Sequence, residues 1–215
     1  MVRPARPEIR GLLIERAAAM LARRETVSLR GLVAGTGVST MAVYTCFDGM
    51  PGLLGAVRQE GFGRLAARLA ALPATDDPVG DLAAAGAAYA ASARDNPDLY
   101  TLMFDGSLPL PDGRAADATL QHLVDTVRRA VEAKRFDPGV EALAFAHELW
   151  MLGHGACMLV ATGVLSFEQV EPIVTSGLAR LYRAAGDDPD ATGRSLNEGW
   201  ARGLGADGGA EAADG

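Results

Sequence analysis

The most chemically suggestive side chains lie between residues 147 and 157, where two histidines, a tryptophan and a cysteine follow a helical spacing. His147 and His154 are seven residues apart and therefore share one face of a helix. Trp150 lies between them, and Cys157 follows three residues after His154. A spacing of i, i+7 separates two side chains by about 10 Å, too far for bonds of roughly 2 Å to one zinc ion. We therefore expect no metal or other cofactor, but polar groups of an apolar pocket or ordinary hydrogen-bonded histidines.

A second group, between residues 28 and 47, has the residue types of a nucleic-acid-binding motif. Two short apolar segments are joined by a turn with Gly35 and Gly37, the arrangement of a helix-turn-helix. The second helix of such a motif enters the major groove, and helix N-termini favour phosphate. The side chains expected to approach DNA are Ser28, Arg30, Ser39, Thr40, Met41, Tyr44 and Thr45. Core packing is the alternative for Met41 and Tyr44.

The charge distribution separates these two groups. The chain has 215 residues and a formal net charge of −7. Residues 1–72 contain ten arginines and five acidic residues, a net charge of +5, whereas residues 73–215 carry −12. A basic segment in an acidic protein is typical of a part that meets a polyanion, and the helix-turn-helix candidate lies within it. Chance drift in composition is the alternative.

Helices are expected to hold both groups. Strand signals are scarce, whereas apolar residues recur at three- and four-residue steps along most of the chain. Ser28, Ser39 and Asn96 are candidate N-caps, and the polar segment 73–78 is the expected domain boundary. Helices are predicted at about 6–24, from 28 to the glycine turn, and at 39–47, 49–72, 79–95, from 96 onward, 114–134, 139–164 and 167–185, with a loop at 106–113.

The last 30 residues, 186–215, are expected to form a disordered tail. They include eight glycines and too little apolar surface to offset the entropy of ordering the chain. Trp200 is the exception, being apolar enough to dock locally.

Composition indicates a folded globular protein, with 49% hydrophobic and 22% charged residues. Two cysteines and no secretory signal predict a cytoplasmic protein without disulfides. Residues 142–165 are apolar enough to test as a membrane span, but they lack basic flanks and contain Glu148. A helix buried inside the protein or at a subunit interface has the same composition, so we expect no membrane partner.

The helix-turn-helix segment resembles the TetR family of one-component transcriptional regulators. The matching run is Ser-Leu-Arg-Gly-Leu-Val-Ala from Ser28, then Gly-Val-Ser-Thr-Met-Ala-Val-Tyr ending at Tyr44, then Phe47, then Gly-Leu-Leu-Gly-Ala-Val from Gly52. Further on, Asn-Pro-Asp-Leu-Tyr from Asn96, and Trp150 with His154-Gly155, resemble the ligand-domain class named for its Trp-His-Gly signature.

The resemblance implies an all-α homodimer that pairs through its last two helices, residues about 139–185. It implies a helix-turn-helix DNA-binding domain over 1–72 and a ligand-binding and dimerisation bundle over 73–185. The function implied is a ligand-responsive regulator, most often a repressor, that binds a near-palindromic operator of double-stranded DNA and is released by a small hydrophobic effector. The residues expected to line the effector pocket are Tyr100, Met103, Phe104, His147, Trp150, Met151, His154 and Cys157.

Two positions depart from the family pattern. The family usually places a lysine that holds a phosphate at the start of the fourth helix, where this chain has Met50, and often a histidine where it has Cys46. A helical interaction module that no longer binds DNA is therefore one alternative. A helical-bundle enzyme is another, although no paired carboxylates, nucleophile elbow or phosphate loop stands out, and we expect no catalytic residues.

Overall fold

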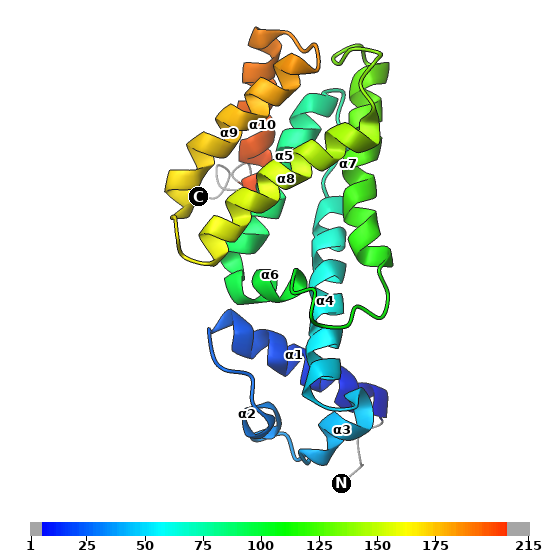
Figure 1. Cartoon of the computed structure of the whole chain (residues 1–215), viewed down its shortest axis with the longest axis vertical. Helices are drawn as coiled ribbons and strands as arrows, with labels where there is room; N and C mark the ends of the chain where they lie inside the picture. The colour runs from blue at the N-terminus through cyan, green and yellow to red at the C-terminus, as the bar shows by residue number, and fades with distance from the viewer. Residues whose placement is uncertain (1–5, 206–215) are drawn as a thin grey trace, which may run out of the picture.

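The computed structural model describes residues 6–205, in which every regular element is a helix and no strand is present. The all-α class expected from the sequence is confirmed. Figure 1 shows α1, α2, α3 and the start of α4 at one end of an elongated molecule, with the remaining helices above them. The helices are α1 (Arg6–Ala22), α2 (Leu29–Val33), α3 (Met41–Phe47), α4 (Met50–Ala70), α5 (Pro78–Asp95), α6 (Pro97–Met103), α7 (Arg114–Glu132), α8 (Ala142–Ala161), α9 (Phe167–Ala184) and α10 (Pro189–Leu204).

The N-terminal helices form a small core around fully buried aliphatic side chains. Leu13 of α1, Leu32 of α2 and Val43 of α3 are each 0% exposed and belong to one cluster. The α3–α4 junction is tight, because a Cβ atom on Gly52 would overlap the carbonyl oxygen of Phe47. Glycine at position 52 therefore lets the two helices approach closely, and this sets the orientation of α3.

The helix starts differ slightly from those expected. Ser28 caps α2 as predicted, and its hydroxyl accepts a hydrogen bond from the Gly31 amide at 3.2 Å. Ser39 does not cap α3, because Thr40 occupies the N-cap position and makes no side-chain capping bond. Asn96 is the N-cap of α6 but likewise makes no capping bond. The side-chain caps expected from Ser39 and Asn96 are therefore absent, which corrects the sequence expectation.

The C-terminal helices enclose a second core. α5 lies at its centre and contacts α4, α6, α7, α8, α9 and α10. Its small residues are almost all buried, and Ala83 and Ala87 are both 0% exposed. α4 continues upward from the N-terminal helices and packs against α7, so one helix joins the two cores.

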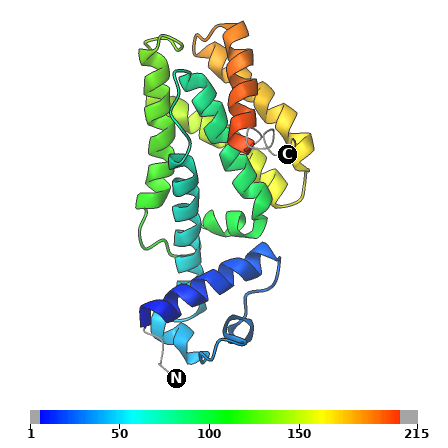
Figure 2. The ribbon, with the colours of Figure 1, turned by 180° about the vertical axis from the view of Figure 1, so that it is seen from behind.

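Helix α10 corrects the expectation of a disordered tail for residues 189–204. Figure 2 shows it alongside α5, the pair with the most extensive contact in the fold. Asp188 caps α10 by accepting bonds from two backbone amides, and Pro189 occupies its first turn. The glycines counted against order allow close packing, since a Cβ atom on Gly199 would overlap the Gly80 carbonyl oxygen. Residues 206–215 of the expected tail lie outside the described part of the chain.

Helix α8 has an exposed apolar side. Its length and composition would allow it to cross a membrane, and only 22% of its most apolar window is buried. Leu143, Met151 and Leu159 are 47%, 61% and 40% exposed, and Ile173 of the neighbouring α9 is 64% exposed. The α8–α9 face is thus an unpaired apolar surface in the single chain.

Candidate functional site

The first candidate site is the outer face of α3. Met41 is 64% exposed and Tyr44 is 52% exposed, whereas Val43 and Phe47 of the same helix are buried. Core packing, the alternative for Met41 and Tyr44, therefore does not account for these two side chains. Thr45 is also exposed, and its hydroxyl donates to the Met41 carbonyl oxygen at 2.9 Å.

The remaining predicted contact residues lie around the ends of α2 and α3. Ser28, Arg30 and Ser39 are exposed, and Thr40 is partly buried. The capping bond uses one lone pair of the Ser28 hydroxyl, which leaves its second lone pair and its proton for an incoming group. The set as a whole lies on one small part of the molecule, the α2–α3 end shown at the bottom of Figure 1.

The two positions that depart from the family pattern lie on the inner side of this region. Cys46 and Met50 are both partly buried and pack against the N-terminal core. Met50 is the first residue of α4, and the Tyr44 ring lies beside Gly49, the N-cap. An aliphatic side chain at position 50 thus adds core contact at the α4 N-terminus, where a lysine would place a positive charge.

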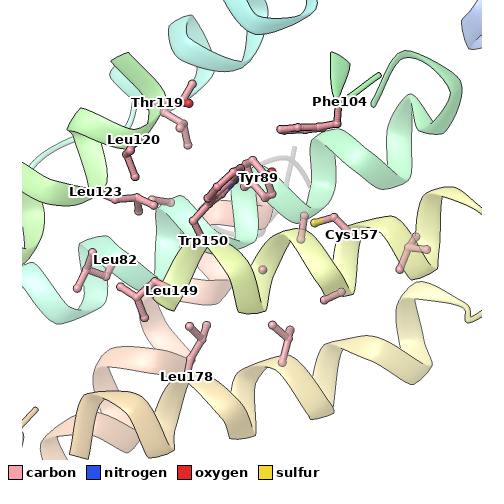
Figure 3. Close-up of a pocket in the computed structure, with 18 of the residues that line it drawn as sticks. Leu82, Tyr89, Phe104, Thr119, Leu120, Leu123, Leu149, Trp150, Cys157 and Leu178 are labelled. Atoms are coloured by element: carbon pink, nitrogen blue, oxygen red, sulfur yellow. Dashed lines mark hydrogen bonds between the residues drawn. The ribbon is translucent and has the colours of Figure 1, made fainter. Parts of the chain in front are cut away.

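The second candidate site is a cavity of about 320 Å³ enclosed by α4, α5, α7, α8, α9 and α10. Figure 3 shows Tyr89 and Trp150 close together in its centre, with Leu120 and Leu123 of α7 and Leu178 of α9 on the walls. Its volume lies at the lower end of the range for small-molecule sites, and its lining is mostly apolar.

Three of the eight predicted pocket residues, Phe104, Trp150 and Cys157, line this cavity. Tyr100 is buried behind the wall, and Met103 packs into the N-terminal core. Five predicted residues are not part of the lining: Tyr100, Met103, His147, Met151 and His154.

Helix geometry explains why two of these residues lie outside the lining. Met151 points out of the bundle, 61% exposed, because it follows the inward-facing Trp150 by about 100° of helix rotation. His147 lies one turn before Met151, on the outer side of α8. It is partly buried, and its ring nitrogen Nδ1 lies 2.8 Å from the Leu143 carbonyl oxygen of its own helix.

A hydrogen-bonded cluster supports the cavity wall from behind. The Tyr100 hydroxyl lies 2.8 Å from the Tyr89 hydroxyl and 2.8 Å from Nδ1 of His154. The Trp150 indole N–H donates to the Tyr89 hydroxyl at 3.3 Å. His154, which the sequence placed in the pocket, therefore acts one layer behind it by helping to fix Tyr89, and through it Trp150.

Burial determines the protonation of this cluster. It raises the pKa values of Tyr89 and Tyr100 well above the ordinary phenol range and lowers the pKa of His154. It also raises the pKa of the Cys157 thiol to about 12. All four groups are thus neutral near pH 7, and the Cys157 thiol is a poor nucleophile. Among residues 6–205, no group of three His, Cys, Asp or Glu side chains could hold a metal ion.

Sequence inspection missed most of the lining. Leu82 and Tyr89 on α5, Thr119 on α7, Glu171 on α9 and Trp200 on α10 all face the cavity. The Trp200 indole N–H donates to the Glu171 carboxylate at 2.7 Å across two helices. Apolar spacing identifies the inner face of each helix, but it does not distinguish residues around a cavity from residues packed in a core.

Helix α4 connects the cavity to the α3 region. Arg58 lines the cavity, and its guanidinium donates to the carbonyl oxygens of Met103 at 2.8 Å and Leu108 at 2.7 Å. The next residue, Gln59, accepts a bond from the Asp112 amide at 3.0 Å. The segment between α6 and α7 is therefore held at both ends by the same helix that packs against α3.

Comparisons with known proteins agree with this architecture. Residues 82–196, more than half of the chain, match the family model described as the tetracyclin repressor-like C-terminal domain. No curated protein matches the sequence.

Several solved structures have a similar fold. A protein of unknown function from Rhodococcus sp. RHA1 is 29% identical, with 82% of this chain and 95% of that chain covered and a TM-score of 0.68. RolR in complex with resorcinol is 19% identical, with 88% and 94% covered and a TM-score of 0.63. A regulatory protein of the TetR family from Rhodococcus RHA1 is 21% identical, with 87% and 100% covered and a TM-score of 0.58.

Proposed function

Because the chain belongs to the TetR family of transcriptional regulators, we propose that it is a homodimeric, ligand-responsive repressor of transcription. In this proposal α3 binds a near-palindromic operator, and a small hydrophobic effector in the cavity releases the protein from DNA. Proteins of this family are regulators and generally not enzymes. A cytoplasmic location, with access to DNA, and membership of the Trp-His-Gly subclass are parts of the same proposal.

The observation that carries the proposal is the exposed face of α3. Met41 and Tyr44 are large side chains held out into solvent by a helix whose other side is buried. In a helix-turn-helix protein this is the side that enters the major groove, where Met41 and Thr45 would approach base edges and Tyr44 a phosphate. Arg30 and the serine-capped start of α2 supply further phosphate partners.

The apolar α8–α9 face supports the dimer. Leu143, Met151, Leu159 and Ile173 together leave a hydrophobic surface uncovered in the single chain. A second copy pairing the same face by two-fold symmetry would bury it and place two α3 helices on one side of the DNA. Operator half-sites centred about 34–36 Å apart, or modestly further, would fit such a pair.

The link between the cavity and DNA is α4. A ligand that contacts Phe104 and Arg58 would displace the segment between α6 and α7, which Arg58 and Gln59 of α4 hold in place. The resulting shift of α4 would move α3. The ligand lowers operator affinity only if it binds the conformer that does not fit DNA more tightly than the conformer that does. The size of the effect is set by the difference between these two binding free energies.

The test is selection of operator fragments. The purified protein is incubated with fragmented genomic DNA from its source, bound fragments are sequenced, and the best is titrated with salt. We expect a palindromic site whose affinity falls steeply as salt rises, because phosphate contacts release counterions. Retention of nothing above the non-specific level at low salt would contradict the proposal and favour the interaction module.

A further inference from the structure

A carboxylate lies on the cavity side of α9, where its neighbours along the helix are apolar. Glu171, Val174 and Leu178 all line the cavity, and steps of three and four residues place them on one face of the helix. Val174 and Leu178 are each 6% exposed, and Glu171 is partly buried, whereas Ile173 on the outer side is 64% exposed. Glu171 therefore faces the bundle, at a position where helical spacing favours an apolar residue.

One oxygen of this carboxylate is bound and the other is not. Oε1 accepts the Trp200 indole N–H at 2.7 Å, and Oε2 makes no hydrogen bond within the described residues. Between residues 6 and 205, the buried side-chain atoms without a partner are Nε of Arg16, Nε of Arg202 and the Tyr182 hydroxyl. Oε2 is unpaired but is not one of these buried atoms, so a small molecule in the cavity can reach it.

No cation of the described chain neutralises this carboxylate. Among residues 6–205, no arginine, lysine or histidine forms an ion pair with Glu171. Arg94, which lies over the Phe167 ring at the start of α9, pairs with Asp95 instead. A carboxylate beside a mostly apolar cavity is unfavourable unless a positive partner accompanies it. A ligand can supply that partner.

The other charged groups of the lining leave this imbalance in place. They are Arg58 of α4 and Asp117 of α7. Arg58 already donates to the carbonyl oxygens of Met103 and Leu108. Together with Glu171 the lining has two carboxylates and one guanidinium, a formal charge of −1. The charges of the lining therefore favour a cation and disfavour an anion.

We propose that Glu171 is the charged anchor of this cavity, and that the ligand is a lipophilic cation, an apolar body that carries one protonated amine. The ammonium group donates a charge-assisted hydrogen bond to Oε2 while Oε1 keeps its bond to Trp200. The apolar body lies along Val174 and Leu178, toward Trp150 at the centre of the cavity (Figure 3). This inference rests on the proposed function in taking the cavity as the effector site.

The first test uses the unaltered full-length protein without DNA and three probes with the same ring system: 2-naphthylmethylamine, 2-naphthylmethanol and 2-naphthoate. Near pH 7 these are a cation, a neutral molecule and an anion. Affinities are measured by calorimetry. We expect the amine to bind about tenfold more tightly than the alcohol, the effect of one charged hydrogen bond, and the naphthoate to bind most weakly. Equal or tighter binding of either other probe, or no binding of the amine, would overturn the inference.

The substitution Glu171→Gln separates charge from shape. The glutamine carbonyl can still accept the Trp200 N–H, so the unfolding midpoint and the affinity for the alcohol should stay unchanged while the advantage of the amine is lost. Asp117→Asn is the matched control, because it removes the same charge from an exposed lining residue, and it should weaken amine binding less than twofold. A retained amine preference in Glu171→Gln, an equal loss in both variants, or a parallel loss of alcohol binding would each contradict an anchor at Glu171.

The indole N–H of Trp200 reports where the amine binds. The chain has two tryptophans, so an isotope-edited NMR spectrum contains two indole signals, and the one that Glu171→Gln moves without any probe belongs to Trp200. The amine should shift this signal more than the alcohol does, because it adds a positive charge beside the carboxylate that accepts the N–H. An equal response to both probes would place the amine elsewhere and overturn the inference.

The outcome is independent of the DNA experiment. A protein that prefers the amine through Glu171 but retains no DNA would leave this inference intact and refute the proposed function. A protein that retains an operator but shows no preference for the amine would do the reverse.

Discussion

The α3 region and the cavity place their functional side chains in opposite environments. The α3 residues come from one short segment and point into solvent, so their partner is met on the surface. The cavity collects side chains from six helices and encloses them. Surface recognition can therefore be encoded in a local motif, whereas an internal site depends on how distant segments pack.

The ion pairs of the two regions differ in the same way. Arg64 of α4 pairs with Glu15 and Glu60 at the surface, and all three side chains are at least 40% exposed. Around α5 and α10, Arg135 pairs with Asp187, whose side chain is 0% exposed. Arg129 and Arg202 both pair with the buried Asp81. Buried ion pairs are thus found among the C-terminal helices, whereas the pairs that Arg64 makes in the N-terminal part are exposed.

The largest expected effect comes from removing a buried carboxylate. Asp187→Ala leaves the Arg135 guanidinium without the bonds of 2.6 and 3.0 Å that it makes to Asp187. We expect a loss of about 3–5 kcal/mol in the free energy of unfolding, measured by urea denaturation. Arg135 keeps Asp77 and Ser195 as partners but loses two charge-assisted bonds, and the buried Thr192 hydroxyl loses its acceptor. Glu60→Ala, at the exposed pair, should cost less than about 1 kcal/mol. Equal losses would remove the contrast between the two regions.

A smaller loss of stability is expected from forcing α5 and α10 apart. A Cβ atom on Gly199 would overlap the Gly80 carbonyl oxygen, so Gly199→Ala should separate the helices and cost about 1–3 kcal/mol by thermal unfolding. Gly193 of the same helix has nothing within 4 Å of such an atom. Gly193→Ala should stabilise by up to about 1 kcal/mol, and a similar loss in both variants would show that α10 does not depend on this close approach.

In the α3 region we expect a change in binding without a change in stability. Tyr44→Ala should weaken operator binding by about 1–2 kcal/mol while the free energy of unfolding stays within about 0.5 kcal/mol, because the side chain is exposed. Arg114→Ala removes a side chain that is 90% exposed at the start of α7, and it should leave DNA affinity unchanged. Equal affinity of Tyr44→Ala and the unaltered protein would exclude Tyr44 from the interface.

The smallest expected effect is a gain in operator affinity. Met50→Lys would place a positive charge at the N-terminus of α4, where the family usually has lysine. We expect about 1 kcal/mol tighter operator binding at low salt, and a salt dependence steeper by about one unit from one added phosphate contact. Met50→Leu is the matched control and should change neither quantity. An unchanged salt slope in Met50→Lys would mean that position 50 does not face the DNA backbone.

Local sequence signals predicted the helices well because each signal acts within one turn or one segment. The Ser28 cap, the break at 73–78 and the Asn96-Pro97 start of α6 are recognisable without knowing what packs against them. The helix-turn-helix belongs to the same class, since its fold and its outward face lie within about 20 residues. The error at Ser39 is one residue long, as is usual for helix ends.

Packing decided the rest. Helix α10 was unpredictable from composition, because its glycines become favourable only where α5 presents the backbone of Gly80 and the side chain of Ala83. The cavity was predicted only in part, for the same reason. Phe104, Trp150 and Cys157 line the cavity, whereas Met151 faces outward.

The sequence by itself therefore determined the helical class and the order of the helices from α1 to α9, because apolar periodicity and capping are local properties. Only the tertiary structure decided which inward-facing side chains surround empty space, which buried charges meet and which face of α8 stays exposed. These outcomes depend on the relative positions of helices far apart in the chain, and no spacing within one helix specifies them.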